Sequence, residues 1–269
     1  MSEGGYFRRA ARLVFRDGTW WWRALVVGAI GLVPYVGLFV VMGYHMVLMR
    51  DAAWGVDRGL PRFSERGEIL RRTGDGLVVS LVWGLVLAVP LALVIVAWVF
   101  VNISHLGTGF DPGLPWWFAY AIWVPSAALG AVSTVALLRS AIYRSTSAGL
   151  SLKGVVSLIR SSPQAFREVT VILVSTSALA LLVGVPVTYV QHASQLPSAL
   201  FTYGWGFTAA AIFAPLWFVV YTAYGLWAKA TDPATWPPLG QSVDAHAGPP
   251  VTGGSDIKPT VVDAPFDDV

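Results

Sequence analysis

The chain has 269 residues, of which 55% are hydrophobic and only 12% are charged, whereas soluble domains carry roughly 25% charged residues. The charges are grouped between long uncharged stretches, a pattern that favours a chain embedded in lipid over much of its length. The absence of cysteine excludes disulfides, thiolate metal sites and cysteine nucleophiles. The net charge of +3 comes from basic residues that flank apolar stretches, and this placement does not indicate nucleic-acid binding.

Residues 1–23 are predicted to form a basic amphipathic segment at the membrane surface. Within residues 6–16 the expected apolar side of a helix consists of Phe7, Ala11, Val14 and Phe15. Arginines surround this side, and three tryptophans follow, as in the aromatic belts at membrane interfaces. The residues expected to contact lipid headgroups are Arg8, Arg9, Arg12, Arg16, Trp20, Trp21 and Trp22.

The first long apolar stretch, residues 22–49, allows two interpretations. One helix of this length would extend about 42 Å, beyond a hydrocarbon core of about 30 Å, so it would tilt or kink at Pro34. Two half-helices, residues 22–33 and 38–49, would instead form a re-entrant hairpin that turns at residues 34–37. Length alone does not distinguish them.

Four later stretches are long, apolar and uncharged, and each is predicted to be a transmembrane helix. They are residues 77–101, 116–138, 169–190 and 199–228. With the first stretch they make up a membrane domain over residues 22–230, and the fold class is an all-α, polytopic membrane protein.

The placement of the basic residues predicts the topology. All 18 Lys and Arg residues lie before residue 24, within 50–72, within 139–167 or after 228, and the connections 102–115 and 191–198 contain none. By the positive-inside rule the basic segments face the cytoplasm. A hairpin at residues 22–49 keeps the N-terminal arginines there, whereas a single crossing places them outside; both interpretations stay open.

Two further features concern organisation. Residues 231–269 are rich in proline and lack any hydrophobic periodicity, so we predict a disordered cytoplasmic tail. The sequence Leu-Met-Arg at 48–50 resembles Leu-Leu-Arg at 137–139, and Gly-Leu at 59–60 matches Gly-Leu at 149–150. This offset of about 90 residues suggests an internal duplication, a common origin of membrane folds.

No catalytic constellation is found. The predicted spans contain no Asp, Glu, Lys or Arg, which argues against a proton-coupled transporter. The chain lacks a Gly-x-Ser-x-Gly elbow, a phosphate-binding Walker loop and a His-Glu-x-x-His zinc motif. We therefore expect no catalytic residue, no metal site and no cofactor.

Residues 34–76 contain Pro-Tyr-Val-Gly at 34–37, Gly-Tyr at 43–44 and Gly-Leu-Pro-Arg-Phe at 59–63, and this segment resembles a prokaryotic membrane family called domain of unknown function 4013. Residues 221–230 look like that family's closing segment. The resemblance implies a polytopic protein of the cytoplasmic membrane and transfers no activity. The matching residues, which either shape one turn or line a cytoplasmic groove, are Pro34, Gly37, Gly43, Tyr44, Arg50, Gly59, Leu60, Pro61, Phe63 and Gly67.

The leading hypothesis is a non-enzymatic scaffold or accessory subunit of the cell envelope. Its expected partners are the lipid bilayer, with anionic headgroups at the cytoplasmic face, and another protein, but no nucleic acid. The alternative is a transporter or lipid-handling permease with a path lined by hydroxyl and aromatic groups.

Overall fold

The computed structural model describes residues 5–33, 36–56, 59–102, 116–194 and 198–231, and every regular element in these ranges is helical, which confirms the all-α prediction. The elements are α1 (Tyr6–Arg16), α2 (Trp20–Gly31), α3 (Val36–Trp54), the 3-10 turn η1 (Phe63–Glu65), α4 (Arg66–Asn102), α5 (Trp116–Tyr143), α6 (Thr146–Leu150), α7 (Leu152–Ser161), α8 (Pro163–Ser194) and α9 (Ser198–Thr231). Pro34, most of the two uncharged connections and the predicted tail lie outside the described residues.

Each of the four predicted apolar stretches lies inside one long helix. The helices α4, α5, α8 and α9 contain 37, 28, 32 and 34 residues, so each extends beyond the stretch that predicted it. α8 begins at Pro163, a residue suited to the first helical position because its missing N–H has no helical partner there. Within the described residues, one segment, Ser126–Tyr143 of α5, is both long and apolar enough to cross a membrane.

Residues 22–49 fold as parts of two helices that pack against each other, α2 and α3. The first turn of α2 and the middle of α3 meet on one group: Arg23 and the Tyr44 hydroxyl both donate to the carbonyl of Pro61, at 3.5 and 3.2 Å. On a single helix these two residues would be about 31 Å apart along the axis. The structure therefore has the hairpin, with helix bounds that differ by a few residues from those predicted, and the single kinked helix is wrong.

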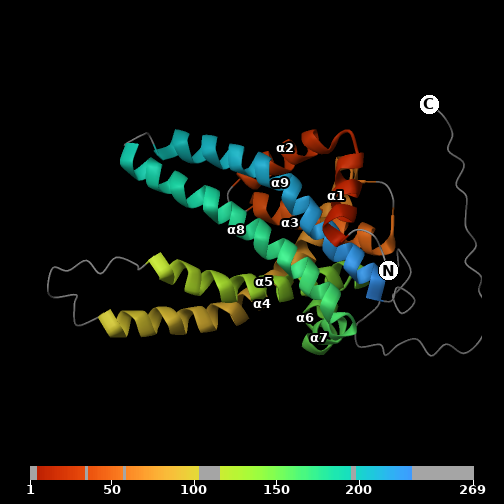
Figure 1. The fold of residues 1–269 in the computed structure, drawn as a ribbon. Helices are drawn as coiled ribbons and strands as arrows, with labels where there is room; N and C mark the ends of the chain where they lie inside the picture. The colour runs from red at the N-terminus through yellow and green to blue at the C-terminus, as the bar shows by residue number, and fades with distance from the viewer. Residues whose placement is uncertain (1–4, 34–35, 57–58, 103–115, 195–197, 232–269) are drawn as a thin grey trace, which may run out of the picture.

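The helix ends separate into two groups (Figure 1). α4 lies beside α5 and α8 beside α9, and the far ends of both pairs point to the same side. The opposite side holds the last turns of α3, α5 and α9, the first turns of α4 and α8, and the short helices α6 and α7. The described residues of the basic segments 50–72 and 139–167 lie here, and we call this side the basic end.

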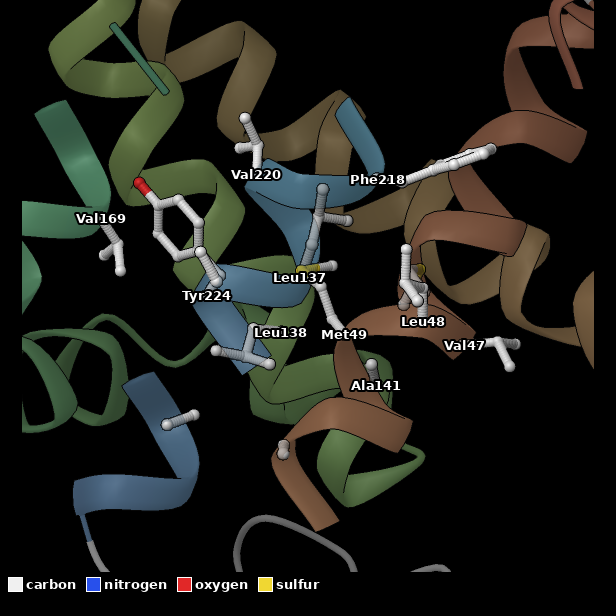
Figure 2. Close-up of a cluster of buried hydrophobic side chains, with 14 of the residues drawn as sticks. Val47, Leu48, Met49, Leu137, Leu138, Ala141, Val169, Phe218, Val220 and Tyr224 are labelled. Carbon is white, nitrogen blue, oxygen red and sulfur yellow. The ribbon is translucent and has the colours of Figure 1, made fainter. Parts of the chain in front are cut away.

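The core lies next to the basic end, where α3 packs between α9, α4 and α5. Figure 2 shows its side chains, which come from α3, α5, α8 and α9 and include Val47, Leu48, Met49, Leu137, Leu138, Ala141, Val169, Phe218, Val220 and Tyr224. α3 and α9 approach closely at Gly225 of α9, where a Cβ atom would overlap the carbonyl oxygen of Met49 and lie 2.6 Å from the Cβ of Ala52. Gly225 therefore sets the spacing between α3 and α9.

The first helix packs one of its sides against the protein. Ala10 and Val14 are buried where α1 packs on α9 and α8, whereas Phe7 and Phe15 are exposed. The backbone N–H of Tyr6 also donates to Glu168 of α8, at 2.7 Å. The predicted apolar side of this helix is therefore covered by the protein at Val14, whereas Phe7 and Phe15 face outward; its contact with a membrane stays a prediction.

The ends of α3 and α5, which the proposed duplication would relate, are alike. At the end of α3 the N–H of Val56 binds the carbonyl of Asp51 and Gly55 has a φ of 71°; at the end of α5 the N–H of Ser145 binds the carbonyl of Ser140 and Arg144 has a φ of 51°. Both are Schellman-type caps. The matched Gly-Leu pairs differ, since Gly59 lies in a turn and Gly149 in α6, so the duplication stays a prediction.

Replacing Gly225 with alanine is expected to push α3 and α9 apart and to lower the free energy of unfolding by about 1–3 kcal/mol, as overpacking does in tight cores. The matched control is Gly84→Ala in α4, where a Cβ would have no neighbour within 4 Å; this change should be neutral or slightly stabilising. Thermal unfolding of both purified variants in one detergent tests this. Equal melting temperatures would contradict the assigned close approach.

Candidate functional site

The candidate site is a charged cluster at the basic end that consists of Arg50, Glu68, Arg72, Asp75 and Arg144. Three guanidinium groups from three helix ends donate to the same carboxylate oxygen, Oε1 of Glu68. Arg72 Nε lies 3.0 Å from it, Arg50 Nη1 3.2 Å and Arg144 Nη2 3.3 Å. Glu68 therefore joins α4 to the ends of α3 and α5.

Burial makes this cluster energetically important. The side chain of Arg72 is 0% exposed and that of Arg50 is 6% exposed. A guanidinium removed from water is unfavourable unless it is paired, and the attraction between charges grows as water is excluded. Glu68 therefore supplies a shared negative charge to all three arginines.

A second carboxylate extends the cluster to α6. Arg72 Nη1 donates to Asp75 Oδ2 at 3.0 Å, and the Thr146 hydroxyl donates to Asp75 Oδ1 at 3.0 Å. Arg72 thus lies between two carboxylates on its own helix, at spacings of four and three residues that place all three side chains on one face.

Arg144 adopts an unusual backbone for its residue type. Its φ of 51° falls in the left-handed region, at the capping position where glycine is the usual residue. Such a conformation costs on the order of 1 kcal/mol for a residue with a Cβ. The bond from its side chain to Glu68 gives a physical reason for arginine at this position.

Electrostatics hold the Glu68 carboxyl ionised. Burial alone would raise its pKa, but the hydrogen bond and charge of Arg72, with the charges of Arg144 and Arg50, outweigh burial and hold the pKa below its ordinary value. Burial, together with the like charge of Arg144, lowers the pKa of the Arg50 guanidinium to about 10, which still leaves it protonated at neutral pH. Since Glu68 is held ionised and Arg50 stays protonated, these two groups suit structural pairing better than general acid–base chemistry.

Next to the cluster, residues 59–61 form a turn that fastens the α2–α3 hairpin. Besides the contacts to Pro61, Arg23 donates to the carbonyl of Leu60 and pairs with Asp17 at 2.9 Å. Burial would raise the pKa of the Asp17 carboxyl, but hydrogen bonds from Thr19 and the charge of Arg23 keep it below its ordinary value. The carboxylates of Asp17 and Glu68 are therefore both held in their charged form.

Most of the predicted family-motif residues meet in this region. Gly43 lies against α4, where a Cβ would overlap the carbonyl oxygen of Ile69 and the hydroxyl of Thr73. The Tyr44 ring is 5.9 Å from that of Phe63.

The remaining motif residues divide into those that join the region and those that do not. Gly59 supplies a φ of 73° and Leu60 is fully buried, whereas Gly37 lies at the other end of the hairpin, against the last turn of α2. Gly67 is exposed with an open Cβ position, so the structure does not bring it into the site, and Pro34 lies outside the described residues.

The predicted headgroup-contacting residues lie on the surface, with one exception. Arg8, Arg9, Arg12 and Arg16 are exposed along α1, and Trp21 and Trp22 are 54% and 55% exposed. Trp20 instead packs edge-to-face on Phe15, with ring centroids 4.9 Å apart, and is partly buried. Direct lipid contact by Trp20 is correspondingly limited.

The sequence prediction identified Arg50 but missed Glu68, Arg72, Asp75 and Arg144 as members of one site. Glu68, Arg72 and Asp75 are spaced four and three residues apart, and this spacing could have predicted ion pairs on one helix face. Nothing in the sequence around Arg144 indicated that it reaches a residue 76 positions away.

Substituting Glu68 with glutamine should leave three guanidinium groups without their shared charge and lower the free energy of unfolding by about 3 kcal/mol, the low end for broken buried ion pairs since Glu68 is partly exposed. The control is Glu65→Gln, which removes a neighbouring carboxylate that takes no part in the ion pairs of Arg50, Arg72 and Arg144 with Glu68. Thermal unfolding in detergent at neutral pH measures both.

The melting temperature of Glu68→Gln should also differ from that of the wild type in its dependence on pH. Because the folded-state pKa of Glu68 is depressed, its contribution to stability is present above the ordinary value of 4.5 and is lost as the pH falls below it. The wild-type and Glu65→Gln melting temperatures should therefore fall more steeply below about pH 4.5 than that of Glu68→Gln. Parallel acid profiles for all three would show that the carboxylate does not stabilise the fold.

Comparison with known proteins agrees with this placement of the motif. A family model described as "Protein of unknown function (DUF4013)" matches residues 26–192, more than half of the chain, and includes the whole site except Arg23 and Asp17. The resemblance of residues 221–230 to the family's closing segment lies outside the matched range. No curated protein and no solved structure matches the chain. The chain belongs to the DUF4013 family of proteins of unknown function.

Proposed function

We propose that this protein is a multi-pass protein of the cytoplasmic membrane that acts as a non-enzymatic scaffold or accessory subunit, with its basic end on the cytoplasmic side. The observation that carries the proposal is a stripe of exposed apolar side chains on α4. Its members recur every three or four residues and are Val78, Leu81, Val82, Leu85, Val86, Val89, Leu93 and Val96, each between 41% and 68% exposed.

The dimensions of this stripe match a bilayer. From Val78 to Val96 it extends about 27 Å along the helix, close to the hydrocarbon thickness of about 30 Å. It begins directly after the charged turn that contains Arg71, Arg72 and Asp75. A continuous apolar surface of this size is unfavourable in water, whereas lipid or another apolar helix would cover it.

The other long helices support the orientation with the basic end on the cytoplasmic side. Val171, Leu179 and Leu182 of α8 are 46–66% exposed, and the far ends of α4, α5, α8 and α9 point away from the basic end (Figure 1). Arginines at one end and bare apolar arms at the other fit the positive-inside rule. Anionic headgroups would attract the exposed arginines of α1.

A scaffold role is favoured by the contrast between a closely packed core at the basic end and an exposed apolar stripe on α4. The core beside the basic end is filled by large side chains such as Trp227, Tyr44 and Phe218, all buried. The α4 stripe, by contrast, has no covering from the described helices. Such an arrangement provides a rigid base with an apolar face for a partner's transmembrane helix. The transporter alternative stays a prediction.

The experiment is purification of the tagged protein from membranes in mild detergent. We expect a protein partner in stoichiometric amount, and we expect the triple change Leu81→Ala, Leu85→Ala, Val89→Ala to reduce its recovery at least fivefold. The control triple is Val171→Ala, Leu179→Ala, Leu182→Ala on α8, which should retain the partner. A monodisperse protein without a partner, or equal recovery with both triples, would contradict the scaffold role.

A further inference from the structure

A groove opens between α2, α3 and the start of α4, with a cavity volume of about 260 Å³. It is distinct from the Glu68 cluster and shares only Tyr44 and Phe63 with the 59–61 region. Its lining is almost entirely apolar and consists of Val27, Ile30, Val40, Val41, Tyr44, Phe63, Arg66, Ile69 and Leu70.

The groove has a polar end and an apolar end. Phe63 and Arg66 lie at the basic end, whereas Ile30 and Val40 lie next to the α2–α3 turn. Arg66 is exposed and forms no hydrogen bond or ion pair with another described residue. A cation thus lies at one mouth of an apolar channel that runs away from it.

We propose that this groove holds one acyl chain of an anionic phospholipid whose phosphate binds Arg66. The proposal rests on the membrane location proposed above, and it names a single site for the lipid. Charge complementarity selects an anionic headgroup, and the order of the groove, arginine first and aliphatic side chains after it, matches the order of headgroup and chain in the cytoplasmic leaflet.

The size of the groove favours a lipid chain over a protein segment. A helix with its side chains is about 10–12 Å across and would not enter a cavity of this volume. An extended peptide would leave backbone N–H and C=O groups against aliphatic walls with no partner, which is unfavourable. An acyl chain is slim and has no polar group to satisfy.

The test is native mass spectrometry of the full-length protein in detergent, incubated with phosphatidylglycerol or with phosphatidylcholine of the same chains. We expect one retained phosphatidylglycerol per protein, with an affinity about fivefold above that for phosphatidylcholine, the preference expected from one arginine. Arg66→Gln should remove this preference. Val41→Trp, which fills the groove, should remove retention of both lipids, and melting temperatures check that each variant is folded.

The matched control is Arg71→Gln, which removes an exposed arginine of α4 that does not line the groove and should retain the wild-type preference. Equal retention by wild type and Val41→Trp, or no preference for the anionic lipid, would overturn the proposal. The proposal would also be overturned if Val41→Trp lost a co-purifying protein but retained the lipid. Carbonate washing of membranes distinguishes failure of the proposed membrane location from failure of the proposed lipid site. Release of the protein by the wash would contradict the membrane location. A protein that is retained but shows no lipid preference would contradict the lipid site alone.

Discussion

The shared carboxylate of Glu68 is the constraint on which the arrangement of the basic end depends. Arg50, Arg72 and Arg144 come from the end of α3, the first turns of α4 and the residue after α5. Two of them are almost completely removed from water, where an unpaired charge would be strongly unfavourable. The three helix ends can therefore be buried together only if they converge on this carboxylate.

Once the basic end is held, close packing positions the helices that leave it. Gly43 lets α3 approach the first turns of α4, and Gly225 lets α9 approach α3. The 59–61 turn binds Arg23 and Tyr44 and so closes the α2–α3 hairpin at its base. Farther from the basic end, α4 exposes its apolar stripe. The proposed partner surface and the proposed lipid groove both follow from close packing at the basic end and from the long helices that extend away from it.

Much of the fold could be predicted from the sequence, because uncharged apolar stretches and proline at a helix start are local signals. The course of residues 22–49 could not, since length fits a tilted helix as well as a hairpin, and the deciding contacts come from Pro61, a residue outside the stretch. For α1, periodicity identified residues that share a face but not that the protein covers this face at Val14. Arg144 was missed because its contact with Glu68 is distant in sequence.

The hairpin brings the start of α2 beside the 59–61 turn. In the proposed membrane orientation it keeps α1, this turn and the Glu68 cluster on the same side. The natural absence of cysteine allows a direct measurement with single-cysteine variants and a membrane-impermeant maleimide. Intact cells should label Gly107→Cys in the uncharged connection, while Gly18→Cys and Gly67→Cys should react only after the membrane is permeabilised. Labelling of Gly18→Cys from outside, with Gly67→Cys still protected, would mean that residues 22–49 cross the membrane once, and would contradict the account.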